Sequence, residues 1–412
     1  MTLQAAEDTE MSPTAAISQE KPVGVSAGMT FLMAASAGLI CANLYYAQPL
    51  AGPIAASIGL PPQATGLIVT LTQIGYGLGL LFVVPLGDLV ENRRLILSMM
   101  VLVTLALLAA AVSSTPSPFL AASLMIGLGS VAVQMIVPFA ASLAPEESRG
   151  RVVGNVVSGL MLGIMLARPV SSFIAEFSSW HTVFYISAAV MVALGVVLAV
   201  KLPTRRPDTR LNYISLLGSM ISLVMTQPVL RRRAAYQFCQ FASFSLFWTV
   251  TPLLLAGPAF GLSQAGIALF ALAGVAGAIA SPIAGRLADR NFGRPATALG
   301  IAALVAGYLI THIAPEGSML ALGLLTLAAI LIDFGVTTTL VISQRAIYGL
   351  NASLRSRLNG LFMAAFFVGG ALGSAIGAWA YATVGWSLAS TIGIALPIVA
   401  LLYFLTEKRT KA

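Results

Sequence analysis

The sequence predicts an all-α integral membrane protein whose twelve transmembrane helices form two six-helix, pseudo-symmetric bundles. The chain has 412 residues, of which 58% are hydrophobic and 9% are charged, and its mean hydropathy is +0.93. A soluble domain carries about 25% charged residues. Apolar stretches long enough to cross a bilayer as helices recur along the chain. Of the 22 Lys and Arg residues, all except Arg168 fall in loops on one side of these stretches, as expected for cytoplasmic loops, which collect positive charge.

Twelve candidate spans follow one another along the chain. The first six cover 29–50, 63–86, 94–113, 118–143, 150–175 and 181–202, and the second six cover 233–256, 264–286, 296–314, 318–343, 355–382 and 386–406. Helices are expected because backbone groups in lipid must be hydrogen-bonded within each segment, and because the strands of a membrane barrel alternate in hydrophobicity. The loops on the opposite side, from 51–62 to 383–386, contain no Lys or Arg. We therefore expect a multi-pass protein of the bacterial inner membrane with both termini in the cytoplasm.

The same pattern predicts the domain organisation. Residues 1–27 are polar and form a disordered cytoplasmic tail, 28–202 form the N-terminal bundle, 203–232 a cytoplasmic linker, 233–406 the C-terminal bundle and 407–412 a second tail. Within the linker, 213–225 is apolar but too short to span the membrane. It is expected to form a helix on the cytoplasmic surface.

Two similar loops indicate an internal duplication. The loop after the second span reads Gly-Asp-Leu-Val-Glu-Asn-Arg-Arg over 87–94, and the loop after the eighth span reads Gly-Arg-Leu-Ala-Asp-Arg-Asn-Phe-Gly-Arg over 285–294. They resemble the signature G-x-L-x-D-R-x-G-R of the major facilitator superfamily. Segments 42–50 and 353–377 also resemble a bacterial branch of drug or metabolite exporters. The resemblance implies secondary active transport by alternating access, without a cofactor.

The resemblance also suggests a cytoplasmic gate. Its residues would be Gly87, Asp88, Glu91, Arg93, Arg94, Gly285, Asp289, Arg290, Gly293 and Arg294. A carboxylate at a helix end can meet the N-terminus of a neighbouring helix, and the arginines can pair with it or with lipid phosphate. The alternative is that these residues only enforce topology and a tight turn.

Small residues recur at four-residue spacing on the second, fifth, eighth and eleventh spans. The stripes are Gly75 and Gly79; Gly159, Gly163 and Ala167; Gly274, Gly277, Ala278 and Ser281; and Gly369, Gly373 and Gly377. Such stripes let helices approach closely in lipid. In the superfamily these four spans are where the two halves meet, so we expect the stripes to form the moving interface. Generic membrane packing is the alternative.

Two charged residues lie inside spans. Asp333 is near the middle of the tenth span and Arg168 in the outward half of the fifth. Because charges are costly in lipid, they usually face a cavity or a partner. Asp333 is expected to exchange protons or substrate, and Arg168 to tune it or bind an anionic group; a structural role for both, and direct pairing between them, remain open alternatives. Arg168-Pro169 stands where the exporter-associated signature has glycine-proline, and Ser123 where many proton-coupled members have an arginine.

Polar and aromatic residues on the central spans are candidates to line a cavity. They are Asn43, Tyr46, Gln48, Gln73, Tyr76, Gln134, Gln237, Gln240, Trp248, Phe362 and Phe366. Pockets combine apolar walls with a few polar groups. As a set, these residues favour a neutral or amphipathic small molecule, whereas each one taken singly is also explained by helix packing.

The sequence lacks the residues that other functional classes require. An integral-membrane enzyme would need a nucleophile or an acid–base pair, and the two histidines have no metal-ligand spacing. No phosphate-binding loop, no filter and no basic nucleic-acid-binding domain is evident. We expect a monomeric secondary transporter in contact with membrane lipid that exports drugs or metabolites in exchange for protons. A proton-coupled uptake symporter for a small organic solute is the alternative.

Overall fold

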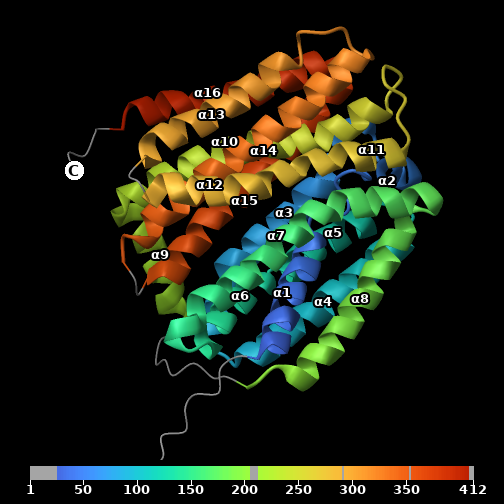
Figure 1. Cartoon of the computed structure of the whole chain (residues 1–412). Coiled ribbons are helices and arrows are strands. Elements are labelled where there is room, and N and C mark those ends of the chain that lie inside the picture. Colours follow the sequence, from blue (N-terminus) through green and yellow to red (C-terminus); the bar gives the residue numbers. More distant parts are fainter. Residues whose placement is uncertain (1–25, 205–211, 290–291, 352–353, 408–412) are drawn as a thin grey trace, which may run out of the picture.

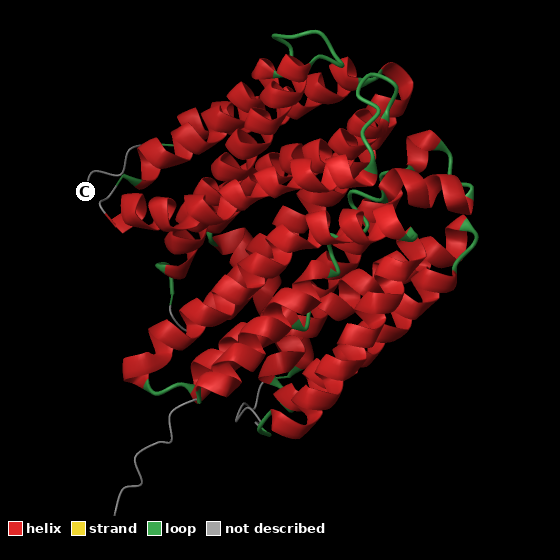
Figure 2. Ribbon diagram, turned by 45° about the vertical axis from the view of Figure 1, so that its right-hand side comes forward, coloured by secondary structure: helices red, strands yellow, loops and turns green. Residues whose placement is uncertain are grey.

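The computed structural model describes residues 26–204, 212–289, 292–351 and 354–407, and between 276 and 289 it gives only the backbone of 276–278, 281, 282, 288 and 289. Regular structure over these residues is helical (Figures 1 and 2). The N-terminal half contains α1 (Ala27–Ala42), α2 (Ala51–Ile58), η1 (Pro62–Ala64), α3 (Leu67–Leu78), η2 (Gly79–Val83), η3 (Val84–Asp88), α4 (Asn92–Val112), α5 (Pro116–Ser130), α6 (Val133–Leu143), α7 (Glu146–Phe177) and α8 (Trp180–Lys201). The C-terminal half contains α10 (Pro228–Ala256), α11 (Gln264–Ala271), η4 (Leu272–Val275), α12 (Ala276–Asp289), α13 (Gly293–Ile310), α14 (Met319–Tyr348), α15 (Arg355–Val384) and α16 (Trp386–Leu405), and α9 (Tyr213–Thr226) joins the halves.

Ten helical segments of the described chain are long and apolar enough to cross a membrane. They coincide with ten of the twelve expected spans. The expected first span is instead divided: α1 ends at Ala42, the chain turns through 43–50, and α2 continues to Gly59, whose φ of 74° ends the helix. The expected eighth span is also divided, into α11, η4 and α12. The structure thus supports a multi-pass helical membrane protein, and the full count of twelve stays a prediction.

The two halves meet along two helix pairs. α3 packs against α15, and α7 packs against α11 and η4. The contacts concentrate at the end that carries α2 and α11. There the side chain of Glu176, at the end of α7, accepts a hydrogen bond from the amide of Ala265 at the start of α11 (2.9 Å). We call this the convergent end; in Figure 1 it lies at the upper right.

Most of the small-residue stripes pack within one half rather than between the halves, contrary to expectation. A Cβ atom on Gly159 would overlap the carbonyl oxygen of Ala34 in α1, and one on Gly373 would overlap that of Ala242 in α10. Both neighbours belong to the same half as the glycine. Close backbone approach therefore holds each half together internally, where helices stay in permanent contact. Gly274 of η4 differs because it faces the other half, and the side chains of 277, 278 and 281 lie outside the described part.

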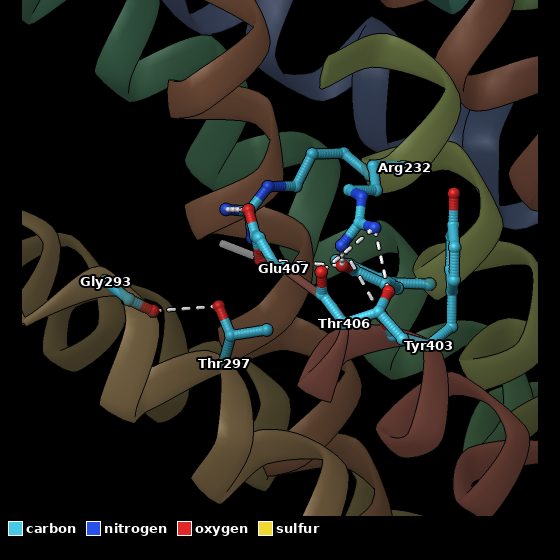
Figure 3. Close-up of polar contacts among 8 residues, drawn as sticks. Arg232, Gly293, Thr297, Tyr403, Thr406 and Glu407 are labelled. Atoms are coloured by element: carbon cyan, nitrogen blue, oxygen red, sulfur yellow. Dashed lines mark hydrogen bonds and ion pairs between the residues drawn. The ribbon is translucent and has the colours of Figure 1, made fainter. Parts of the chain in front are cut away.

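The opposite end is rich in arginine, and we call it the arginine-rich end. There α10 begins beside the end of α16: Arg233 pairs with Glu407 (3.1 Å), and Arg232 donates to the Thr406 hydroxyl (2.8 Å) and covers the ring of Tyr403 (Figure 3). The linker contains a helix, α9, and its place on the cytoplasmic surface stays a prediction. Its residues Leu216, Met220 and Leu223 are buried against the protein, whereas Ile214 and Ile221 on the other side are exposed.

Candidate functional site

Arg168 lies in the wall between the two halves. It belongs to α7 and is only 3% exposed. Its Nε donates a hydrogen bond to the side-chain oxygen of Gln48 (2.8 Å), which belongs to the same half. Its guanidinium lies over the rings of Trp248 (4.5 Å) and Phe244 (5.5 Å) from α10 of the other half, and of Tyr45 (5.0 Å) from its own. Cation–π attraction strengthens when the cation is removed from water.

Asp333 is held by the same tryptophan. It lies in α14, is 6% exposed, and accepts a 2.8 Å hydrogen bond from Nε1 of Trp248. The two charged side chains therefore share one indole: Arg168 covers its face and Asp333 binds its edge. Because Trp248 contacts both side chains, a change in the protonation of Asp333 can alter the position of Arg168 without an ion pair between them.

Gly274 marks the place where these groups converge. A Cβ atom on this residue of η4 would lie 3.4 Å from the Trp248 ring, 3.6 Å from Nη1 of Arg168 and 3.6 Å from Oδ1 of Asp333. We call Arg168, Trp248, Gly274 and Asp333 the cross-half cluster. From the sequence alone, the different depths of Arg168 and Asp333 in their spans did not decide whether the two side chains pair. The structure brings them together because the eighth span is broken at η4 and presents a glycine between them.

In the closed arrangement, Arg168 offsets part of the cost of burying a charge on Asp333. Burying a lone charge costs far more than burying a pair, because attraction in a poorly polar interior offsets part of the lost hydration. Arg168 supplies the positive charge from one half and Asp333 the negative charge from the other. Nη2 of Arg168 is buried and has no hydrogen-bond partner among the described residues. This guanidinium nitrogen is therefore a strong hydrogen-bond donor without an acceptor in the described structure.

Several predicted cavity residues form a second contact between the halves. The Gln73 amide donates to the Ser245 hydroxyl (2.9 Å), which lies 2.7 Å from that of Ser374. Gln134 donates to the hydroxyl of Tyr76 (2.8 Å). The Tyr76 ring lies 4.4 Å from that of Phe367 in α15. These links place Gln73 and Tyr76 at the meeting of α3, α10 and α15.

The remaining cavity candidates are placed within one half. Asn43 accepts from Ser187 of α8 (2.5 Å), and Gln240 accepts from Thr339 of α14 (2.8 Å). Gln237 donates to the Val336 carbonyl (3.3 Å). Tyr46 is half-buried beside α7. Phe362 is buried in an apolar cluster with Leu223 of α9, and Phe366 stacks on Phe241 at 3.5 Å.

Buried polar atoms without partners in the described structure gather on the central helices. Five of the nine such atoms are Oε1 of Gln73, Oε1 of Gln237, Nε2 of Gln240, Oγ1 of Thr338 and Nη2 of Arg168. Such groups are uncommon because an unmade buried hydrogen bond costs about 1–3 kcal/mol. Water or a polar solute reaching these helices would satisfy them. The arrangement is therefore suited to transient binding rather than to a fixed apolar core.

The predicted gate residues lie at the arginine-rich end. Glu91 pairs with Arg94 (3.0 Å), Arg93 donates to the carbonyl of Ala199, and Arg357 of α15 is near enough to act on the charge of Asp88. Gly87, one residue before the end of η3, lies beside Met135. In the second copy Arg294 covers the Phe404 ring at 5.3 Å, Gly293 accepts from Thr297 (Figure 3), and Gly285 adjoins open space. The side chain of Asp289 and all of Arg290 lie outside the described residues.

Some residues in or beside the cross-half cluster were not expected from the sequence. Tyr45 and Phe244 were not singled out, because aromatic residues are ordinary in membrane spans, and Gly274 was noted only as one of a stripe of small residues. One signal was available: Phe241, Phe244 and Trp248 recur at helical spacing and form an aromatic stripe on α10. Of the described acidic and His/Cys residues, no group of three could hold a metal ion.

Comparison with known proteins identifies relatives along nearly the whole chain. The sequence profile of the Major Facilitator Superfamily matches residues 29–351 and 234–412. The uncharacterized transporter YgaY of Escherichia coli O157:H7 is 39% identical over 378 residues, covering 92% of this chain and 95% of YgaY. A Streptomyces coelicolor protein named "Probable transporter SCO4007" is 33% identical over 367 residues, covering 89% of this chain and 84% of that protein.

Solved structures share the fold at low sequence identity. The crystal structure of a point mutant of the nucleoside transporter NupG superposes with a TM-score of 0.75 at 13% identity, covering 91% of this chain and 98% of NupG. The human organic anion transporter MFSD10 superposes with a TM-score of 0.68 at 16% identity, covering 92% of this chain and 100% of MFSD10.

Proposed function

The chain belongs to the Major Facilitator Superfamily of transporters, and from this premise we propose that it exports a small organic molecule in exchange for protons. The observation that carries the proposal is the cross-half cluster, in which Arg168 from one half and Asp333 from the other share Trp248. Alternating access requires a contact that forms on one side of the substrate site and breaks when that side opens. A contact built on a titratable carboxylate couples this motion to protons.

The cluster lies toward the convergent end, so its formation accompanies closure of that end. When the halves part there, Asp333 loses the nearby Arg168 cation and meets water on that side of the membrane, from which it takes up a proton. When they come together again, Arg168 favours the charged carboxylate and the proton is released toward the arginine-rich end. A solute that binds at the arginine-rich end before opening travels the other way. This sequence describes antiport.

The solute is a neutral or amphipathic drug-like molecule or metabolite. Aromatic side chains on α10 and α15, among them Phe241 and Phe366, supply stacking surfaces, and the unpaired amide atoms of Gln73, Gln237 and Gln240 supply a few hydrogen bonds. Nucleosides and organic anions, which name the transporters NupG and MFSD10, belong in the first test panel.

The protein acts as a monomer in the bacterial inner membrane, with both termini in the cytoplasm. The location of the arginines supports this orientation, because Lys and Arg accumulate in cytoplasmic loops. Arg93 and Arg94 at the start of α4, Arg231 to Arg233 at the start of α10 and Arg355 at the start of α15 all lie at helix ends. The convergent end then faces the periplasm. The gate residues at the arginine-rich end would latch that side when the convergent end opens.

Proton flux in energised inside-out vesicles tests the function directly. Compounds of the panel are added while the internal pH is followed, with vesicles lacking the protein as blanks. We expect one compound to dissipate the proton gradient in a transporter-dependent way, and the variant Asp333→Asn to abolish that response. Glu316→Gln, which changes an exposed carboxylate in the loop before α14, is the matched control. Uptake of labelled solute without proton movement, or an unchanged response in Asp333→Asn, would refute the role of Asp333; proton movement in the same direction as the solute would identify an uptake symporter.

A further inference from the structure

A groove runs along the contact between α1 and α7. We call it the α1–α7 groove; its volume is about 940 Å³, and it extends from Ala27 of α1 to Tyr46 in the turn after α1, and from Ser148 to Val170 on α7. Its floor is backbone, because a Cβ atom on Gly38 of α1 would overlap the carbonyl of Gly159. In Figure 1, the label of α1 lies below that of α7 and between those of α6 and α4. The groove belongs wholly to the N-terminal half and contains no residue of the cross-half cluster.

The middle of the groove faces the bilayer. Leu166 and Val170 lie two residues before and after Arg168, which is about 200° around a helix that turns about 100° per residue. Since Arg168 points at the other half, these two side chains point away from it. Leu166 is 45% exposed and Val170 is 44% exposed, and Phe31 on the α1 side is 75% exposed. Exposed apolar side chains on a membrane helix contact lipid chains.

One end of the groove is polar and positively charged. Arg151, in the first turns of α7, lines it together with Asn155 and Ser158. The Arg151 side chain is exposed and has no hydrogen bond or ion pair with a described residue. Glu146 and Glu147 precede it in the first turn but do not line the groove. An unpaired guanidinium beside amide and hydroxyl groups is suited to a phosphate group.

The distance between the polar and apolar parts matches one leaflet of a membrane. From Arg151 to Leu162 along α7 is about 16 Å at a rise of about 1.5 Å per residue, roughly half the hydrocarbon core of about 30 Å. Leu162 is 54% exposed and lines the groove. A lipid whose phosphate lies at Arg151 would therefore place its acyl chains against Leu162 and the glycine floor.

We propose that the α1–α7 groove binds an anionic phospholipid of the leaflet at the arginine-rich end, with its phosphate on Arg151. The positive end selects a negative headgroup, and the apolar length accommodates an acyl chain. Because α1 and α7 belong to the same half, a lipid seated here fills the groove without crossing the contact between the halves. The proposal is independent of the direction of transport and of the coupling ion.

Lipid binding is measured by native mass spectrometry of the full-length protein released from detergent. Phosphatidylglycerol and phosphatidylcholine are titrated separately. We expect Arg151→Gln to weaken phosphatidylglycerol binding about tenfold, as for loss of one charged hydrogen bond, and to weaken phosphatidylcholine binding less, because the choline cation offsets the charge of its phosphate. Arg149→Gln is the matched control, because Arg149 is exposed two residues away, donates to the carbonyl of Ala141 and does not line the groove.

A second variant locates the binding in the groove. Leu162→Trp enlarges an exposed side chain of the groove wall, so it should preserve folding, checked by size-exclusion chromatography, and displace the acyl chain. We expect weaker binding of phosphatidylglycerol. Equal phosphatidylglycerol binding in wild type and Arg151→Gln, or undiminished binding in Leu162→Trp, would overturn the proposal.

Discussion

Arg168 reaches from α7 to aromatic rings on both sides of the boundary between the halves, and Trp248 beyond that boundary also binds Asp333. The indole therefore has two separable functions. Its face attracts the guanidinium, and its N–H group stabilises the carboxylate. A phenyl ring preserves the first and removes the second, so one substitution can distinguish them.

Trp248→Leu is expected to favour opening of the convergent end. It removes the ring that Arg168 of the other half covers, a cation–π contact worth about 2 kcal/mol or more when it is shielded from water, and this loss falls only on the closed state. The labelling rate of Leu253→Cys, measured in a background without the native cysteines, should rise by about tenfold for each 1.4 kcal/mol lost. Trp248→Phe is the matched control, because it keeps a ring for Arg168 and removes only the bond to Asp333, which joins α10 to α14 within one half. Equal labelling in both variants would show that the ring contact does not hold the halves together.

Gly274 is predicted to tolerate a methyl group but not a larger side chain. A Cβ atom would make only ordinary contacts, at 3.4 Å or more, with the three groups around it. Gly274→Ala should therefore retain transport, whereas Gly274→Leu should separate Arg168 from Asp333 and abolish it. Both are compared by solute flux at equal expression. Loss of transport in Gly274→Ala would mean that the space beside this residue is itself used in the cycle.

At the scale of elements, most of the glycine stripes bind helices of the same half. α7 rests on α1 at Gly159 and Gly163, and α15 rests on α10 at Gly369 and Gly373. In lipid, helices associate through dispersion contacts and not through exclusion of water. Helices that stay packed together therefore gain most stability from close approach, whereas a moving surface does not need small residues. The pattern of small residues thus predicts close packing but not which helix is the partner.

Gly163→Ala should destabilise the N-terminal half. The added methyl group would overlap the carbonyl of Gly38, and both groups belong to backbone that cannot move independently. Overpacking of this kind costs about 1–3 kcal/mol, so the melting temperature in detergent should fall by several degrees. Gly154→Ala, on the same helix with open space around it, should be neutral or stabilising because alanine favours the helix. A similar melting temperature for both variants would contradict the packing of α7 on α1.

The sequence was sufficient for some of these elements and not for others. Ten spans could be found because apolar length is a local property. Arg168 and Asp333 could be found because a charge within a span is rare. Their meeting at Gly274 could not, since it depends on the break at η4 and on which helices of different halves face each other. For the same reason, most of the glycine stripes were wrongly assigned to the interface between the halves: the sequence does not show which helix packs against each glycine.

For the whole molecule, closure of one end follows from contacts that cross between the halves. Glu176 binds the start of α11, Gln73 binds Ser245, and Thr70 donates to the Ala371 carbonyl (2.9 Å). At the arginine-rich end α9 contacts both halves instead: Tyr213 donates to the Phe82 carbonyl (2.8 Å), and Ser219 accepts from Arg357 (3.2 Å). The linker can therefore limit how far that end separates while the convergent end remains closed.

Cross-linking the convergent end should stop transport if the halves must part there. A Cβ atom on Gly52 of α2 would lie 3.0 Å from a terminal carbon of Leu253 in α10, so cysteines at both positions are within reach of a short cleavable thiol cross-linker. Cross-linked Gly52→Cys/Leu253→Cys protein in vesicles should lose solute flux and regain it when the cross-link is cleaved. The matched pair Met100→Cys/Gly195→Cys joins α4 to α8 within one half, where the corresponding distance is 3.8 Å, and should leave flux intact. Only the first pair bridges the boundary between the halves. Flux that persists in the cross-linked Gly52/Leu253 protein would therefore mean that the solute passes without opening of the convergent end. Alternating access about the cross-half cluster would then have to be abandoned.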